Sequence, residues 1–310
     1  MGIDTVLVTG GAGFIGSALC RALVARGTRV IAYDNLRFGS RDLLPDDPRC
    51  DFVQGDVRDA AALRRVLQDG RVRAVCHLAA LHFIPYCIAH PEEATDVNVN
   101  GTRQVLDACR LARPEVLLFA STAAVYPAEE GPFAEEHAPG PIDVYGATKL
   151  MGEDLAHAFA LETGVSTVIA RLFNAFGPRD TNPHLIPDVL AQLGEGDTVR
   201  LGNLEPVRDY VHLDDLAAAL IELLDMRRKG CAVFNVGSGE GRSVREVLAA
   251  FEAAIGRPLR VMQDPDRVRR VERPRLVADA GKLRETGWRP RVGFDEGIRR
   301  LAAGLRARAG

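Results

Sequence analysis

Residues 6–19 read VLVTGGAGFIGSAL, and this stretch decides the fold class. Its glycines Gly11, Gly13 and Gly16 follow a predicted strand and open a predicted helix. Glycines at this spacing let the backbone turn tightly and approach a pyrophosphate, whose charge then lies at the helix N-terminus. An ordinary strand-to-helix turn is the alternative interpretation, and the next predicted strand distinguishes between the two.

That second strand ends in Asp34, 18 residues after the last glycine of the motif. A carboxylate here can accept hydrogen bonds from two ribose hydroxyls, which favours a dinucleotide site. The same carboxylate repels a 2′-phosphate, so we expect NAD rather than NADP, although Arg37 and Arg41 lie close behind and work against that preference. Asp56 and Val57, after the third strand, suit the adenine edge, and Asp56 alone is equally suited to capping a helix.

The first half of the chain alternates apolar runs with amphipathic ones. Predicted strands are Thr5–Thr9, Arg29–Tyr33, Asp51–Val53, Ala74–Leu78, Val116–Ala120 and Thr167–Leu172. Predicted helices are Phe14–Ala25, Ala60–Leu67, Glu92–Leu111, Tyr145–Glu162, Asp214–Leu224, Val244–Ile255 and Phe294–Leu301. This alternation predicts an α/β protein with a Rossmann-type, doubly wound parallel sheet. We expect an NAD-binding domain at 1–174 and a smaller C-terminal α/β substrate-binding lobe at 175–310, from which a segment can return to the first domain.

Length and composition exclude several classes of protein. The 310 residues exceed the ~250–300 that one hydrophobic core usually holds, which fits a domain plus a smaller lobe. A net charge of -3, from 39 basic and 42 acidic residues, argues against nucleic acid as a partner. No run approaches the ~20 apolar residues of a membrane span. Six scattered cysteines without CxxC spacing indicate reduced thiols, so we expect a cytoplasmic protein.

Tyr145 and Lys149 lie four residues apart, so a helix places a phenol and an ammonium on one face. A free tyrosine has a pKa near ~10 and is a poor base at pH 7. Lowering that pKa by ~3 units takes ~4 kcal/mol of differential stabilisation, which a nearby ammonium and a positive nicotinamide can supply. A surface tyrosine and lysine with no mutual role is the alternative, so the pair gains weight only from the motifs around it.

Those motifs follow one another in an order that resembles the extended short-chain dehydrogenase/reductase family, specifically its nucleotide-sugar epimerase and dehydratase branch. The matching segments are Thr9–Gly16 (TGGAGFIG), His77–Ala80 (HLAA), Asn98–Thr102 (NVNGT), Ser121-Thr122 before Val125-Tyr126, Tyr145 with Lys149, Arg171–Pro178 (RLFNAFGP), Arg208–Asp215 (RDYVHLDD), and Arg269 with Glu272. The resemblance covers nearly the whole chain. It also implies a homodimer in which the helices Glu92–Leu111 and Tyr145–Glu162 pair into a four-helix bundle.

The resemblance implies a role for each matching residue. The NAD contacts would be Gly10, Gly13, Phe14, Ile15, Gly16, Asp34, Asn35, Asp56, Val57, Leu78, Ala79, Ala80, Asn98, Tyr145 and Lys149. The catalytic residues would be Thr122, Tyr145 and Lys149. The contacts to a nucleotide-diphosphate sugar would be His82, Thr122, Asn174, Arg208, Arg269 and Glu272. Asn100 would brace the fold near the active site, and no metal site is expected.

Two alanines indicate which reaction of the family to expect. Family 4,6-dehydratases place Asp-Glu directly after the catalytic threonine, whereas this chain has Ala123-Ala124. Decarboxylating members carry Glu at the second position and 3,5-epimerases carry Cys, but Ala124 can transfer no proton. Thr122, Tyr145 and Lys149 with NAD suffice for hydride transfer and deprotonation of one hydroxyl. We therefore expect a 4-epimerase, in which the diphosphate stays anchored while the 4-keto sugar turns.

Two other functions stay open at this point: a ketoreductase or dehydrogenase that exchanges its cofactor, and a catalytically silent NAD-binding protein. His82 lies in the loop Leu81–Cys87, which departs from that of common epimerases. It is predicted either to contact the sugar or phosphate or to be a packed loop residue. Leu276 stands where narrow-specificity relatives carry a tyrosine, so an N-acetyl group at C2 is expected to fit.

Overall fold

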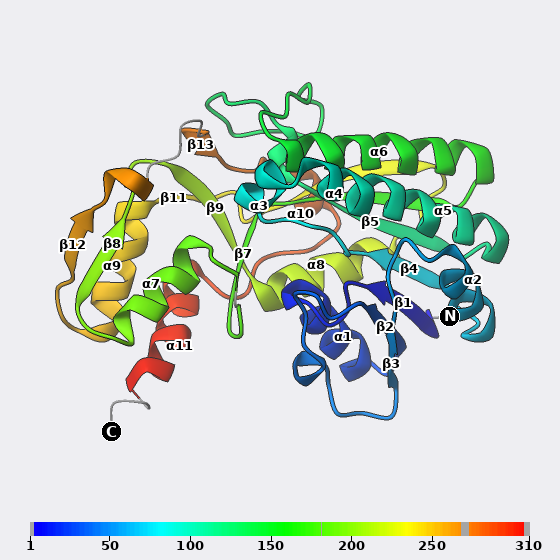
Figure 1. Cartoon of the computed structure of the whole chain (residues 1–310), viewed down its shortest axis with the longest axis horizontal. Coiled ribbons are helices and arrows are strands. Elements are labelled where there is room, and N and C mark those ends of the chain that lie inside the picture. The colour runs from blue at the N-terminus through cyan, green and yellow to red at the C-terminus, as the bar shows by residue number, and fades with distance from the viewer. Residues whose placement is uncertain (1–2, 181, 268–272, 307–310) are drawn as a thin grey trace.

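The computed structural model describes residues 3–180, 182–267 and 273–306. At its centre lies a parallel sheet of seven strands in the order β10-β6-β5-β4-β1-β2-β3 (Figure 1). The strands are β1 (Thr5–Thr9), β2 (Arg29–Asp34), β3 (Cys50–Gln54), β4 (Ala74–His77), β5 (Val116–Thr122), β6 (Ser166–Leu172) and β10 (Cys231–Val236). The strand order reverses at β1, and open parallel sheets bind ligands beyond the carboxyl ends of strands at such a point.

Helices cover both faces of the sheet because side chains along each strand alternate between two apolar cores. On β1, Val6 and Val8 belong to one core and Leu7 to the other. The helices over the first core are α1 (Phe14–Ala25) and α8 (Leu213–Asp225), and those over the second are α2 (Ala60–Asp69), α5 (Gly101–Ala112) and α6 (Val144–Thr163). Figure 1 shows α5 and α6 side by side above the sheet, with α1 and α8 below it. The predicted doubly wound α/β class is confirmed.

A smaller α/β lobe, on the left in Figure 1, follows in the second half of the chain. Its strands are β7 (Asn174–Phe176), β8 (Thr198–Leu201), β9 (Val207–His212), β11 (Gly241–Ser243), β12 (Arg260–Gln263) and β13 (Arg275–Leu276). Strand β9 pairs with β7, β11 and β13, and β8 pairs with β12. The helices α7 (Leu185–Leu193), α9 (Val244–Ile255) and α11 (Phe294–Arg306) surround a separate core that contains Phe176, Phe251 and Ile298. Strand β10 and helix α8, although later than residue 175, belong to the central sheet and its cover.

One long predicted helix is wrong in detail. The span predicted as Glu92–Leu111 consists of α4 (Pro91–Thr95), a π-helical turn (Asp96–Asn100) and α5. The wider turn changes which side chains point inward, and such turns occur often at functional sites. The remaining short helices are α3 (Ile84–Ala89) and α10 (Gly281–Glu285). Within the described residues, no helix is long and apolar enough to cross a bilayer.

Candidate active site

A cavity of about 1080 Å³ opens beyond the carboxyl ends of the central strands. Residues after β1, β2, β4, β5 and β6 line one side, and residues of the C-terminal lobe line the other. The predicted site residues in its wall are Gly10, Gly13, Phe14, Ile15, Gly16, Asp34, Asn35, Val57, Leu78, Ala79, Ala80, His82, Thr122, Tyr145, Lys149, Asn174 and Arg208. Asp56 and Asn98 are described but are not in the wall. Arg269 and Glu272 lie outside the described residues.

The glycine loop leaves a cradle in front of α1. A Cβ atom on Gly16 would lie 2.0 Å from the Gly10 carbonyl oxygen, so only glycine permits this approach of helix to loop. Gly13 is the residue before α1, and no side chain caps the helix there. The first turn also contains no acidic side chain. Its backbone N–H groups are therefore available to an anion in the cavity.

The Asp34 carboxylate is presented beside this cradle at the end of β2. The Ala12 backbone N–H donates to Oδ2 at 3.1 Å, and the Leu36 N–H donates to Oδ1 at 2.8 Å. Burial raises the pKa of Asp34, while these two hydrogen bonds lower it and stabilise the charged form. Each oxygen retains a lone pair for a further donor such as a ribose hydroxyl.

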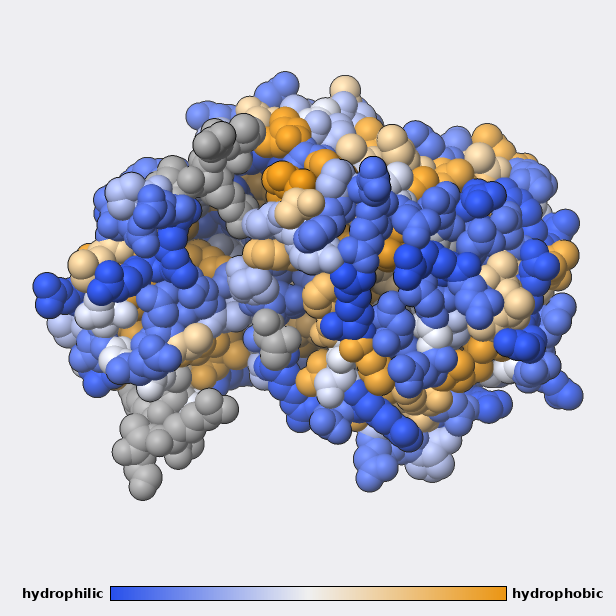
Figure 2. Space-filling model, in the orientation of Figure 1, coloured by the Kyte–Doolittle hydropathy of each residue, from blue (hydrophilic) through white to orange (hydrophobic). Residues whose placement is uncertain are grey.

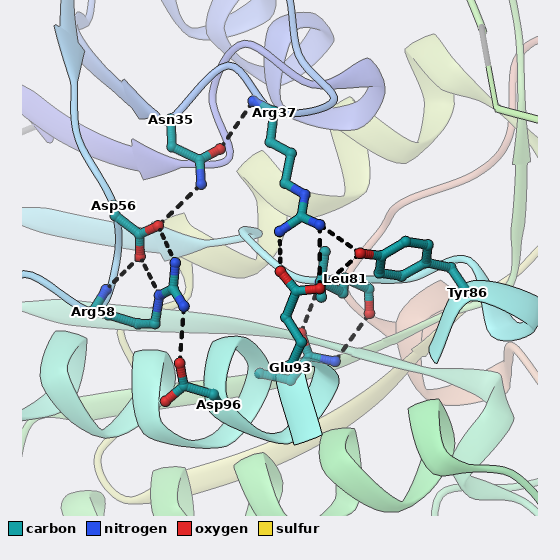
Figure 3. Close-up of polar contacts among 9 residues, drawn as sticks. Asn35, Arg37, Asp56, Arg58, Leu81, Tyr86, Glu93 and Asp96 are labelled. Atoms are coloured by element: carbon teal, nitrogen blue, oxygen red, sulfur yellow. Dashed lines mark hydrogen bonds and ion pairs between the residues drawn. The ribbon is translucent and has the colours of Figure 1, made fainter. Parts of the chain in front are cut away.

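Asp56 lies between Gly55 and Val57, which both line the cavity, and its carboxylate contacts neighbouring side chains. Its carboxylate forms an ion pair with Arg58 at 2.8 Å and accepts a hydrogen bond from the Asn35 amide at 3.1 Å (Figure 3). Arg58 in turn reaches Asp96 at 2.8 Å. These contacts, those with Arg58 above all, hold the pKa of Asp56 well below its usual range. Asp56 thus fixes the position of Asn35, which itself lines the cavity, and its contact with the adenine edge stays a prediction.

Asn98 braces the loop after β4 from within the π-helical turn. Its side-chain oxygen accepts from the Leu81 N–H at 2.7 Å, and its amide donates to the Leu81 carbonyl at 2.9 Å and to the Thr148 hydroxyl at 3.0 Å. All three partners are protein groups, and only 1% of Asn98 is exposed. The brace expected at Asn100 is therefore wrong, because the Asn100 amide bonds Asp96 at the surface.

Thr122 and Tyr145 meet in the cavity from different elements. Thr122 is the last residue of β5, and its hydroxyl oxygen accepts from the Ala124 N–H at 3.1 Å. Tyr145 lies in the first turn of α6, which Asp143 caps by accepting from the Gly146 N–H at 2.8 Å. Burial raises the pKa of Tyr145, and a hydrogen bond with Thr122 opposes that shift by stabilising the phenolate.

Lys149 is buried one turn further along α6. Burial lowers its pKa to about 7, and the negative charge of Glu153 opposes this shift. The ammonium lies 4.2 Å from the centre of the Phe119 ring on β5. Glu153 is held in turn by Arg171, at 2.8 and 2.9 Å. Burial thus disfavours the phenolate form of Tyr145 and the ammonium form of Lys149. Both charged forms therefore depend on the neighbours named above.

The loop after β4 and the C-terminal lobe face each other through two histidines. His82 and His184 have ring centres 5.7 Å apart in an edge-to-face arrangement. Burial lowers the pKa of His82 to about 4, and a hydrogen bond with Asn182 opposes that shift. His82 is therefore neutral at pH 7. Arg208 on β9 also lines the cavity, and its guanidinium donates to the carbonyls of Val207 and Arg273, each at 2.9 Å.

Comparisons with known proteins agree with this geometry. A family model described as the NAD dependent epimerase/dehydratase family matches residues 6–237. The chain belongs to this family. A UDP-glucose 4-epimerase of Azospirillum brasilense is 36% identical, over 96% of this chain and 90% of that protein.

Solved structures are similar over nearly their whole length. The NAD complex of UDP-glucose 4-epimerase from Thermus thermophilus has a TM-score of 0.88 and 35% identity, over 97% of this chain and 99% of that one. UDP-glucose 4-epimerase from Thermotoga maritima, with UDP-glucose, has a TM-score of 0.89 and 28% identity, over 99% of this chain and 100% of that one. The expected membership of the nucleotide-sugar epimerase branch is confirmed.

The cofactor of this epimerase/dehydratase family member is NAD. The residues present fit the dinucleotide. A Cβ on Gly16 would clash with the backbone of the loop that forms the cradle, the N–H groups before and in the first turn of α1 suit a pyrophosphate, and the Asp34 carboxylate suits two ribose hydroxyls. These features line the same cavity as Tyr145 and Lys149.

Arg273 is a residue of this site that the sequence analysis missed. It is 6% exposed, and its guanidinium joins three points: Asp143 at 3.0 Å and the carbonyls of Ala124 and Tyr126 at 2.7 and 3.1 Å. The C-terminal lobe is thereby fastened both to the loop after β5 and to the residue that caps α6. The sequence shows a run of arginines at 267–275, but nothing in that run marks Arg273 as an internal tie.

Proposed function

We propose that this protein is an NAD-dependent 4-epimerase of a nucleotide-diphosphate sugar. The observation that carries the proposal is the set of groups around the cavity near Lys149. Thr122 and Tyr145 meet there, while the adjacent Ala123 and Ala124 also line the wall and offer no acid or base. Elimination, decarboxylation or 3,5-epimerisation would each need a further proton-transferring side chain at these positions. Redox chemistry at one hydroxyl-bearing carbon needs no such group.

The residues act on the C4 hydroxyl of the sugar. Tyr145 as phenolate removes the hydroxyl proton, and Thr122 hydrogen-bonds the same oxygen. When bound, NAD accepts a hydride from C4 and returns it. Lys149 stabilises the phenolate by its positive charge. After the 4-keto sugar has turned to present its other face, Tyr145 gives the proton back, so the protein ends each cycle in its starting state.

Turning requires that the rest of the substrate stay fixed. Arg208 lines the cavity on the side of the C-terminal lobe, and a guanidinium can bind a diphosphate in a bidentate manner. We propose that Arg208 does so together with Arg269, that Glu272 accepts hydrogen bonds from the nucleotide ribose, and that Asn174 and His82 contact the sugar or phosphate. On this view residues 1–174 chiefly bind NAD, and residues 175–310 chiefly bind the substrate. We also propose a cytoplasmic homodimer.

The balance of cofactor tests the proposal. An epimerase oxidises and reduces the same carbon, so the purified protein should interconvert C4 epimers with no added NAD, or with a catalytic trace, and accumulate no NADH. A panel of UDP-, GDP-, CDP- and dTDP-sugars, followed by mass spectrometry and by absorbance of NADH, gives both readouts. Stoichiometric NADH with a released keto sugar would establish the dehydrogenase instead. No turnover of any sugar, with NAD bound, would favour the silent NAD-binding protein.

A further inference from the structure

Three side chains join two loops at the edge of the cavity. Arg37 follows β2, Tyr86 lies in α3 and Glu93 lies in α4. The Arg37 guanidinium forms an ion pair with Glu93 and donates to the Tyr86 hydroxyl, and that hydroxyl donates to the Glu93 carboxylate at 2.7 Å. Figure 3 shows the three groups converging, with Arg37 descending from its loop onto the other two. We call Arg37, Tyr86 and Glu93 the clasp.

The clasp connects the two sides of the cofactor region. Residues 37–39 line the cavity on one side, and residues 81–85 with Ile88 line it on the other. Tyr86 and Glu93 themselves are not in the wall. Arg37 lines the cavity in segment 37–39, and its guanidinium bonds Tyr86, which follows segment 81–85, and Glu93. The contact ties the two segments together outside the space that the dinucleotide would fill.

The loop that carries Arg37 is fastened at both of its ends. The Leu36 N–H donates to Asp34 at 2.8 Å, and the Ser40 N–H donates to the Ala12 carbonyl at 3.0 Å. Both anchor points belong to the NAD cradle. The clasp adds a third attachment at the middle of the loop. Breaking or forming the clasp contacts would therefore alter the mouth of the cavity and change the cradle little.

Aromatic rings add to the polar contacts. The Arg37 guanidinium carbon lies 5.4 Å from the Phe38 ring centre and 5.5 Å from that of Tyr86. The Phe38 and Tyr86 rings meet edge to face at 6.2 Å, although Phe38 is 58% exposed. Isolated surface ion pairs contribute little to stability. A guanidinium that contacts a carboxylate, a phenol and two rings together is held in a better defined position.

We propose that the clasp retains NAD in the cavity between catalytic cycles. The inference rests on the proposed function, because an enzyme that restores NAD within each cycle gains from keeping it bound, whereas a dehydrogenase must release it. Arg37, at 37% side-chain exposure, and Glu93, at 30%, remain accessible to salt. Release should therefore depend on ionic strength, since screening weakens partly exposed charge pairs.

The experiment measures release of NAD from the purified holoprotein, as exchange with an excess of a fluorescent etheno-adenine analogue. Glu93→Gln keeps the size of the side chain and removes its charge. Its release rate should exceed that of the wild type by about tenfold, because changes at a contact act mainly on dissociation. Tyr86→Phe should give a smaller increase, because the ion pair with Glu93 stays. Raising salt should speed release from the wild type and have less effect on Glu93→Gln.

Asp51→Asn is the control, because it breaks the Arg29–Asp51 ion pair, which is also partly exposed, at 54% and 45%, but does not line the cavity. Its release rate should equal that of the wild type. A Glu93→Gln rate within about twofold of the wild type, or an equal acceleration by Asp51→Asn, would overturn the clasp. C4 interconversion by the same wild-type preparation is measured in parallel. Its absence would overturn the proposed function, whatever the release rates are.

Discussion

The ammonium of Lys149 lies 4.2 Å from the centre of the Phe119 ring, and both side chains are buried. The contact depends on Gly152, because a Cβ there would lie 2.4 Å from the Phe119 ring. A ring face attracts a cation most strongly where water is excluded. Other titratable groups near Lys149 are Tyr145 and Glu153 on the same helix, His77 at the end of β4 and His82 in the following loop. Burial keeps the pKa of His77 at about 3 and that of His82 at about 4, so both are neutral at pH 7.

Phe119→Leu should therefore move the pH profile of kcat. Burial already lowers the pKa of Lys149 to about 7, so the ammonium is the form present below that pH. Losing the ring face lowers this pKa further, and the basic limb of the profile should move to lower pH by about one unit.

Phe133→Leu is the control for this prediction, because Phe133 is equally buried and stacks on Tyr126, 4.7 Å away. Both variants should lose about 1–2 kcal/mol in the free energy of unfolding. Only Phe119→Leu should move the basic limb. If both variants leave it in place, the ring has only a packing role.

Tyr145→Phe should slow interconversion of C4 epimers by at least ~10²–10⁴, the usual contribution of a positioned acid–base group. The bound NAD content, measured after denaturation, should not change, because the glycine cradle and Asp34 are untouched. A variant that loses activity and NAD together would show that the phenol serves cofactor binding instead of proton transfer.

Leu276→Tyr should narrow the range of sugars. Leu276 lines the cavity and lies opposite Arg208 in the pairing of β13 with β9. We expect the C2 substituent to lie beside this position, and a tyrosine ring would take up that space, so the ratio of kcat/KM for an N-acetylhexosamine to that for the plain hexose should fall by about tenfold. Leu276→Met, which keeps the volume, should leave the ratio nearly unchanged. An unaltered ratio in Leu276→Tyr would contradict the volume argument.

The proposed homodimer makes a prediction about mass in solution. Leu111 on α5 and Met151 and Leu161 on α6 are 59%, 50% and 76% exposed, and Figure 2 shows orange apolar patches over the region that these helices occupy in Figure 1. Light scattering at micromolar concentration should give twice the 33.6 kDa of one chain. Leu161→Glu should reduce the mass to one chain, whereas Val261→Glu, on β12 of the other lobe, should not. A wild-type mass of 33.6 kDa would rule out the dimer.

Local sequence was sufficient for the features that depend on neighbours in the chain. The glycines before α1 and the carboxylate of Asp34 are legible because a strand, a turn and a helix follow one another within a few residues. The spacing of Tyr145 and Lys149 translates directly into one helical face, since the α-helix has a fixed period. The parallel sheet followed from the alternation of strands and helices alone.

Tertiary structure decided which residues far apart in the chain meet. Arg273 ties the C-terminal lobe to Asp143, 130 positions earlier, and no periodic pattern marks such a partner. Asn98, and not Asn100, holds the loop after β4, because a π-helical turn shifts which side chain points inward. Arg37 could be read from the sequence only as a cation near Asp34, whereas the fold places it against Tyr86 and Glu93. Hydrogen bonds and ring contacts are short-ranged and directional, so their partners are determined only when the packed elements bring the two atoms together.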